Sequence, residues 1–244
     1  ETLPATLIAD EGLMSRQSAI RALHFPEKPE DVESARQRMA FEEMYALQCE
    51  ALERKKLWQG AHQKRLMIPM NADLIKLFFA SLKFQPTNSQ KIAIYEILKD
   101  MEKDTAMSRL LEGDVGSGKT LVAVAVMATA VAAGGQCAMM VPTEVLARQH
   151  AETVSRLLLT FHSFLQAQGM GEKLRLPSVS LLTGSTPDPD ARDCKVKLAN
   201  GNTDIVIGTH ALIEDSVQFR DLKLVIVDEQ HRFGVNQRAK LKDK

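Results

Sequence analysis

Eight consecutive residues, GDVGSGKT at 113–120, combine three glycines with a lysine and a threonine. Glycines let a chain turn so that successive backbone N–H groups point at phosphate oxygens. Lys119 would place a positive charge at the β and γ phosphates, and the Thr120 hydroxyl would ligate magnesium. A structural turn before a helix is the plainer alternative. The pattern predicts a loop that binds Mg-ATP, formed by Gly113, Asp114, Val115, Gly116, Ser117, Gly118, Lys119 and Thr120.

Two adjacent acids, Asp228 and Glu229, follow the apolar run LVIV at 224–227. An enzyme with such a phosphate loop needs a carboxylate at the end of a neighbouring strand to hold Mg²⁺, and Asp228 fits. Glu229 could leave the strand axis, face the γ-phosphate, and orient and deprotonate the attacking water. Alone, the pair would be interpreted as the end of a strand. Beside the glycine loop, we predict Lys119, Asp228 and Glu229 as catalytic residues and Thr120 and Asp228 as metal ligands.

The segment TNSQ at 87–90 follows Phe84 and has two compatible interpretations. Thr-x-x-Gln is the spacing of a capping box at the start of a helix. The Gln90 amide, which offers both a donor and an acceptor, could also hydrogen-bond the edge of adenine. Spacing alone favours the cap, and Thr87 could cap the helix while Gln90 reads the base.

These motifs need a scaffold that brings distant residues together. After residue 107, short apolar runs alternate with helical stretches, which predicts an α/β fold with a parallel sheet flanked by helices. Gly134 and Gly135 are a natural helix stop. We expect strands at 109–111, 136–141, 179–182, 204–207 and 222–227, helices at 119–133 and 144–159, and surface loops at 167–177 and 187–192.

The first part of the chain predicts helices and carries no chemistry. Pro29, Glu30 and Asp31 form a favourable first turn, and the apolar residues from Ala40 to Ala51 recur at helical spacing. Two more helices are expected within 72–103, joined by SLKFQPTNSQ. We therefore predict an α-helical linker region at 1–71 and an ATP-binding domain at 72–244.

Bulk composition constrains the function only weakly. The 31 basic and 31 acidic residues give zero formal net charge, so any contact with nucleic acid must depend on local motifs. The three cysteines are far apart, which argues against disulfides or a zinc site and suits a reducing compartment. The longest apolar run, at 121–133, is shorter than the roughly 20 residues that span a bilayer, so no membrane partner is expected.

In chain order, the motifs resemble those of superfamily 2 helicases: Phe84, Thr87 and Gln90, then GDVGSGKT, PTEVLARQH (142–150), TGS (183–185), IVIGTH (205–210) and DEQH (228–231). GDVGSGKT and DEQHRFGVNQR are most similar to the RecG family of branch-migrating DNA helicases, which remodel stalled replication forks. The resemblance covers about 82–238, and more weakly the region from Leu23. It implies a RecA-like P-loop NTPase lobe that uses ATP and Mg²⁺ on branched or forked DNA.

The resemblance also implies roles for residues that the pattern alone would leave as turns. Phe84, Thr87 and Gln90 would complete the nucleotide site. The DNA backbone path would be lined by Pro142, Thr143, Glu144, Gly184, Thr209 and His210. Nucleotide and DNA would be coupled through Gln230, His231, Arg232, Gln237 and Arg238. Backbone amides and a helix N-terminus can take phosphates without basic residues, which suits a chain of zero net charge.

Other expectations concern the whole protein and the places where this sequence departs from the resemblance. Motif III, a second RecA-like lobe and an arginine finger do not occur between Glu1 and Lys244, so we expect a piece of a longer, monomeric protein of the bacterial cytoplasm. The stretch at 159–177 is longer than the resemblance predicts, and TPDPDARDCKVK after TGS is not rich in glycine and lysine as the resemblance predicts. Both departures concern the DNA contact and leave the ATP site unaffected.

Other functions remain open from sequence. The motor lobe of the transcription–repair coupling factor is closely related. A P-loop small-molecule phosphotransferase would leave PTEVLARQH and IVIGTH unexplained. A catalytically inactive nucleotide-sensing scaffold would not need Lys119, Asp228 and Glu229 intact.

Overall fold

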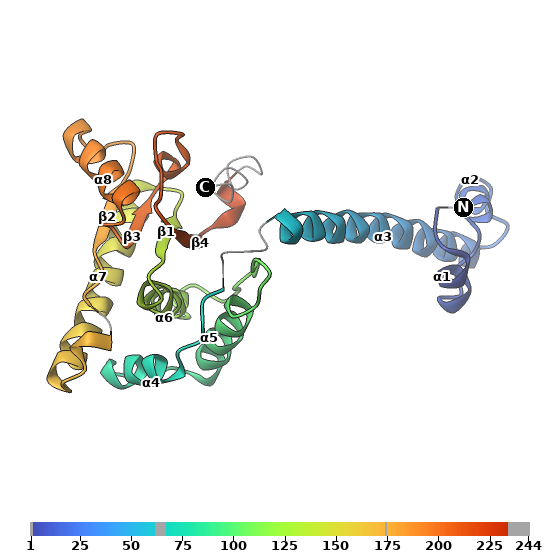
Figure 1. Cartoon of the computed structure of the whole chain (residues 1–244). Coiled ribbons are helices and arrows are strands. Elements are labelled where there is room, and N and C mark those ends of the chain that lie inside the picture. Colours follow the sequence, from blue (N-terminus) through green and yellow to red (C-terminus); the bar gives the residue numbers. More distant parts are fainter. Residues whose placement is uncertain (1, 62–66, 174, 234–244) are drawn as a thin grey trace. The chain divides into compact units, whose positions relative to one another are not determined.

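The computed structural model describes residues 2–61, 67–173 and 175–233. It divides into two compact units, Glu1–Gln63 and Lys64–Lys244 (Figure 1). No helix in the described ranges is both long and apolar enough to cross a membrane.

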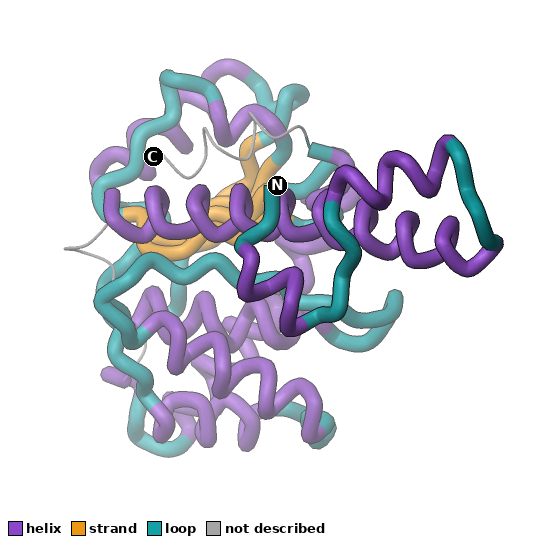
Figure 2. The backbone as a smooth tube through the Cα atoms, turned by 90° about the vertical axis from the view of Figure 1, so that its right-hand side faces the viewer, coloured by secondary structure: helices purple, strands orange, loops and turns teal. Residues whose placement is uncertain are grey.

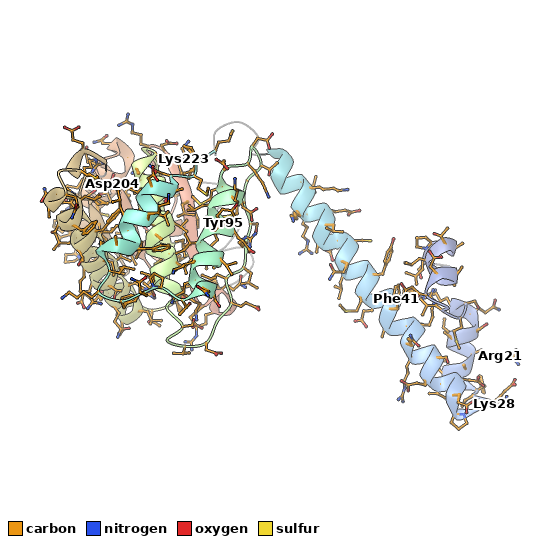
Figure 3. All side chains as sticks on the ribbon, turned by 90° about the horizontal axis from the view of Figure 1, so that it is seen from below. Arg21, Lys28, Phe41, Tyr95, Asp204 and Lys223 are labelled. Atoms are coloured by element: carbon orange, nitrogen blue, oxygen red, sulfur yellow. The ribbon has the colours of Figure 1, made fainter. Side chains whose placement is uncertain are left out.

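The first unit is helical, as predicted, with α1 at Ala5–Asp10, α2 at Arg16–His24 and α3 at Pro29–Ala61. The Ser15 hydroxyl caps α2 by accepting a hydrogen bond from Ser18 N at 3.1 Å. α2 packs along α3, where the small side chains of Ala19 and Ala35 are fully buried. Arg21 and Lys28 lie near the turn that joins these two helices (Figure 3).

The second unit is built on a four-stranded sheet in the order β2-β3-β1-β4. All neighbouring strands are parallel, and Met139 of β1 pairs with Ile207 of β3 and Ile226 of β4. The predicted α/β class with a parallel sheet is therefore confirmed. The strands are β1 Gln136–Met140, β2 Val179–Leu182, β3 Ile205–Gly208 and β4 Leu222–Val227.

Helices cover both faces of this sheet (Figure 2). Alternate residues of one strand enter different cores: Cys137 and Met139 join the larger core with α4 to α7, whereas Ala138 and Met140 join a smaller one with α8. The helices are α4 Ala72–Ser81, α5 Asn88–Met101, α6 Lys119–Ala132, α7 Glu144–Ala167 and α8 Asp188–Asn200, with short 3₁₀ turns η1 Gly171–Lys173, η2 His210–Ile213 and η3 Gln230–Arg232.

The larger core is centred on aromatic packing between helices. Phe78 of α4 is fully buried and meets Phe161 of α7 edge to face, with ring centroids 5.2 Å apart. Ile68 also joins this core, and its backbone N donates to Met101 O at 2.9 Å. Residues 67–71, which precede the predicted domain start at residue 72, thus contribute to the packing of the second unit.

The predicted strand at 109–111 is wrong. Leu110 is 59% exposed, and Arg109 forms ion pairs with Glu96 at 2.7 Å and with Asp100 at 2.6 Å, both on α5. Hydrogen bonds from Lys103 and then Arg109 lower the pKa of Asp100. Charge pairing therefore holds this segment against α5, and the apolar pair of leucines is too short to override it.

One predicted helix is longer than expected, and one predicted loop is the start of a helix. The helix expected at 144–159 continues to Ala167, because Phe161 and Leu165 extend its buried face. The loop expected at 187–192 is instead the start of α8, whose first turn carries the acids Asp188 and Asp190 that favour a helix N-terminus. The helix stop at Gly134 is confirmed by its positive φ of 83°.

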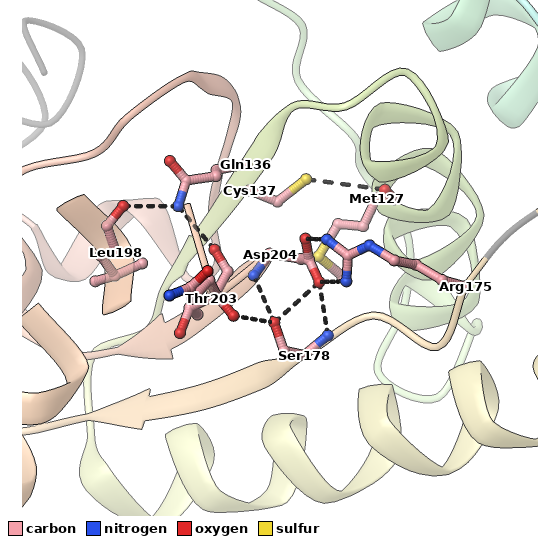
Figure 4. Close-up of polar contacts among 9 residues, drawn as sticks. Met127, Gln136, Cys137, Arg175, Ser178, Leu198, Thr203 and Asp204 are labelled. Carbon is pink, nitrogen blue, oxygen red and sulfur yellow. Dashed lines mark hydrogen bonds and ion pairs between the residues drawn. The ribbon is translucent and has the colours of Figure 1, made fainter. Parts of the chain in front are cut away.

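A network of hydrogen bonds connects residues at the amino ends of the strands (Figure 4). The Asp204 carboxylate accepts two hydrogen bonds from the Arg175 guanidinium, at 2.8 and 2.5 Å, and one from Ser178 N at 2.7 Å. Gln136 Nε2 donates to the carbonyls of Leu198 and Thr203. Because the buried Asp204 and Gln136 side chains obtain hydrogen-bond partners here, this edge of the sheet has a structural role.

Two of the cysteines are packing residues. Cys137 in β1 and Cys194 in α8 are buried, and burial raises the pKa of both thiols.

Candidate nucleotide site at the carboxyl edge of the sheet

The glycine loop folds around the ammonium group of its own lysine. Lys119 Nζ donates to Gly113 O at 2.6 Å and to Asp114 O at 2.9 Å. Ser117 N closes the turn by donating to Asp114 O at 3.1 Å. Helix α6 begins at Lys119, so the predicted order of loop followed by helix is present.

Gln90 connects helix α5 to this loop. The predicted capping box is confirmed, because Gln90 N donates to Thr87 Oγ1 and Thr87 N donates to Gln90 Oε1. The other end of the amide, Nε2, donates to Ser117 O at 2.8 Å. The roles of Gln90 at adenine and of Phe84, which is 53% exposed, remain predictions.

A Gly118→Ala substitution is expected to weaken nucleotide binding about tenfold. Gly118 has φ +81°, and an added Cβ would lie 2.4 Å from Gln90 Nε2. The left-handed conformation costs an L-residue roughly 1–2 kcal/mol, and Gln90 would have to release Ser117. Fluorescence titration with an ATP analogue measures the affinity. Gly134→Ala is the matched control, because φ is +83° there and the space beside it is open. Equal affinity loss in both variants would contradict this explanation.

The paired acids directly follow β4, as predicted. Asp228 N donates to Met140 O at 2.9 Å and so extends the pairing with β1 by one residue. Glu229 has φ 50° and ψ 47°, the single left-handed non-glycine residue within the described ranges. This conformation is strained for an L-residue, and such strain concentrates at functional sites. The backbone therefore turns sharply at the residue expected to leave the strand axis.

Topology places the start of α6 and Asp228 at the same edge of the sheet. Helix α6 contacts β1 and β4 and is joined to β1 by the short turn at 133–135, so it runs antiparallel to both strands. Its 14 residues span about 21 Å, more than the roughly 17 Å of the five residues of β1. Lys119 and Thr120 therefore lie at the carboxyl ends of the strands, where Asp228 follows β4.

This set of residues fits a magnesium–triphosphate complex. Mg²⁺ in such sites is held by one or two protein oxygens together with phosphate oxygens, and Thr120 and Asp228 offer a hydroxyl and a carboxylate. The N-terminus of α6 and Lys119 supply the positive field that phosphates need.

The sequence interpretation missed a side chain that contacts the candidate metal ligand. His150 Nε2, on the second turn of α7, lies 3.0 Å from Asp228 Oδ2. The two side chains are partly buried, 15% and 29% exposed. Their separation of 78 residues explains why sequence spacing gave no sign of the pair.

The candidate DNA-binding residues follow three adjacent strands. Because the strand order is β2-β3-β1, Gly184 after β2, His210 after β3 and Thr143 after β1 share the carboxyl edge. Thr143 caps α7 by accepting from Leu146 N at 3.3 Å. Of the two candidate residues that follow β3, Thr209 is only 3% exposed, so His210 is the accessible side chain there.

Glu144 connects the segment after β1 to the loop after β2. Its Oε1 accepts a hydrogen bond from Ser185 N at 3.0 Å, and its Oε2 accepts one from Ser185 Oγ. Glu144 thus fixes the loop after β2 against the start of α7, beside Pro142. Its contact with DNA remains a prediction.

The candidate coupling residues are only partly described. Gln230 to Arg232 form η3 directly after the acid pair. The side chain of His231, and Gln237 and Arg238, lie outside the described residues.

Comparison with known proteins agrees with this arrangement. The sequence pattern of the DEAD/DEAH box helicase family matches residues 87–244. The ATP-dependent DNA helicase RecG of Streptococcus pneumoniae is 42% identical over 246 residues, covering 100% of this chain and 34% of the relative. RecG of Synechocystis is 41% identical over 241 residues, covering 99% of this chain and 27% of the relative. The chain thus spans about a third of the length of these curated relatives.

A solved structure of RecG bound to a three-way DNA junction has the same fold. It aligns with a TM-score of 0.76 at 38% identity and covers 96% of this chain and 30% of that one. The resemblance to RecG is therefore confirmed over the whole chain, and the predicted RecA-like lobe is confirmed as its fold.

Proposed function

The chain belongs to the DEAD/DEAH box helicase family, and from that premise we propose that it is the first motor lobe of an ATP-driven DNA helicase acting on branched DNA. The observation that carries the proposal is the meeting of the glycine loop and the acid pair at one edge of the sheet. Similarity to RecG, solved with a three-way DNA junction, supports branched or forked DNA as the partner, in fork rescue, recombination and repair.

In this mechanism each motif has a separate task. Lys119 binds the β and γ phosphates, and Thr120 and Asp228 hold Mg²⁺. When bound there, Mg²⁺ would supply positive charge that offsets the negative charge of the phosphate oxygens. Glu229 accepts a proton from the attacking water and orients it in line with the γ-phosphate. Phe84, Thr87 and Gln90 hold the base and tie α5 to the loop through Ser117.

We propose that the edge formed by the ends of β2, β3 and β1 binds the DNA backbone. Gly184, Thr143 and His210 would face the phosphates, and Glu144 would keep the loops in register. The turn after Glu229, continuing through Gln230, His231, Arg232, Gln237 and Arg238, would relay the presence of the γ-phosphate to this edge. Helix N-termini and backbone amides bind phosphates without net positive charge, as in a chain with equal numbers of acids and bases.

Further features of the whole protein are proposed with it. The helical region at 1–71 would link the motor domain at 72–244 to a DNA-gripping domain. A second RecA-like lobe would supply an arginine finger, typically worth about 10³–10⁵ in rate. The protein would act as a monomer in the bacterial cytoplasm, in keeping with its bacterial relatives.

The other functions raised by the sequence are not favoured. A phosphotransferase or an inactive scaffold does not account for the helicase pattern over 87–244. The coupling-factor motor is less well supported, because the similarity to RecG extends through the helical region as well.

Lys119→Ala tests the nucleotide site directly. Loss of charge-assisted hydrogen bonds, each worth about 1.5–3 kcal/mol, should weaken Mg-ATP binding about 10- to 100-fold. Titration of the chain with fluorescent methylanthraniloyl-ATP measures this. Lys76→Ala removes a lysine that is 77% exposed on α4 and should bind like the wild type. A wild-type chain that fails to bind Mg-ATP would overturn the proposal; in a longer protein, Lys119→Ala should also abolish fork-dependent ATP turnover.

A further inference from the structure

One face of helix α7 carries a polar residue where its pattern calls for an apolar one. The face turned to the larger core consists of residues spaced three or four apart: Ala147, His150, Val154, Leu158, Phe161 and Leu165. Each of the other five is fully buried. His150 is thus the polar member of an apolar stripe, at the end of the helix nearest to the carboxyl edge of the sheet.

A polar side chain in such a position costs stability unless it is hydrogen-bonded. His150 satisfies the requirement through Asp228, with Nε2 at 3.0 Å from Oδ2. A carboxylate that binds a metal ion acts only as an acceptor, so His150 would serve as the donor through Nε2. The contact therefore occupies one carboxylate oxygen and leaves Oδ1 as the free one for a metal ion.

We propose that His150 is a positioning residue of the nucleotide site, which orients the Asp228 carboxylate for Mg²⁺ and attaches it to α7. This inference rests on the proposed nucleotide site. Carboxylates that bind metals are themselves held by hydrogen bonds, and loss of such a partner typically costs about 10- to 100-fold in metal affinity or activity. Without His150, the Asp228 side chain would sample other rotamers. The entropy lost on fixing one rotamer would then oppose metal binding.

The same helix is anchored to the edge proposed to bind DNA. Glu144, six residues before His150, holds the loop at Ser185 through two hydrogen bonds. Six residues of helix span about 9 Å, so the two contacts lie within two turns of one rigid element. A shift of α7 caused by a ligand at the Glu144 end would therefore act on the Asp228 carboxylate.

Two substitutions separate positioning from packing. Leucine fills the stripe with an apolar side chain of similar size but cannot donate a hydrogen bond. The amide nitrogen of glutamine reaches about as far as histidine Nε2 and can donate one. If His150 serves only in packing, His150→Leu should keep function and His150→Gln should lose it. If His150 positions Asp228, His150→Gln should keep function and His150→Leu should lose it.

The measurement is the gain in affinity for methylanthraniloyl-ATP when Mg²⁺ replaces EDTA. We expect His150→Leu to reduce this gain about tenfold, with unchanged affinity in EDTA and an unchanged melting temperature. His150→Gln should retain most of the gain. Glu152→Ala, an exposed position one half-turn further along α7, should match the wild type.

Further variants show whether His150 acts through Asp228. In an Asp228→Ala background, His150→Leu should cause no additional loss, because the partner is already absent. A wild-type gain in His150→Leu, or an additive loss in the double variant, would overturn the inference. Failure of the wild type to bind Mg-nucleotide at all would instead count against the proposed function, so the two failures are distinguishable.

Discussion

Glu229→Gln is expected to lower ATP turnover by about 10²- to 10⁴-fold, the usual contribution of a general base. Glutamine has the size of glutamate and can hydrogen-bond water, but it cannot accept the proton that water must lose. Affinity for Mg-ATP should not fall, because the proposed site assigns the phosphates and metal to Lys119, Thr120 and Asp228. Turnover is measured with forked DNA in a protein that carries the second lobe, and affinity by titration of this chain.

The control for this prediction is Glu152→Gln, which makes the same change at an exposed position on α7. It should turn over ATP at the wild-type rate. If Glu229→Gln is equally active, the acid pair merely ends β4, and its left-handed backbone has no catalytic purpose. If affinity falls together with turnover, Glu229 serves in binding instead.

Much of the fold followed from local pattern. The runs that became β2 and β4 were bounded correctly because each is a short apolar stretch flanked by polar residues. Helix α6 was recognisable because a glycine pair ends it at Gly134. The segment at 109–111 failed for a tertiary reason, since the partners of Arg109 lie 9 and 13 residues earlier on α5. Periodicity carries no information about such pairing.

The candidate nucleotide site could be proposed from sequence because its residues form short consecutive motifs of characteristic residue types. The loop and the acid pair each occupy a few consecutive positions, and a parallel sheet brings strand ends to one edge. The partner of Asp228 was not predicted, because a lone histidine in a helix has no distinctive spacing. One sign was available: His150 falls three residues after Ala147 and four before Val154, within the apolar stripe of α7.

Phe78→Ala is expected to destabilise the second unit by about 3–5 kcal/mol, the usual cost of removing a buried phenylalanine. Phe78 is fully buried, and it packs edge to face on Phe161. Urea unfolding followed by circular dichroism measures the change. Phe84→Ala makes the same substitution at a side chain that is 53% exposed, and should cost less than about 1 kcal/mol.

This pair of variants separates stability from binding. Phe161 lies on α7, the helix that also carries Glu144 and His150 at its other end. The cavity left by Phe78→Ala would loosen the far end of α7, yet the hydrogen bonds at Ser185 and Asp228 hold the near end. Well below the unfolding midpoint, Phe78→Ala should therefore bind Mg-ATP like the wild type, whereas Phe84→Ala should bind it more weakly. The reverse pattern would mean that α7 is positioned by the aromatic core, and that its polar contacts merely follow.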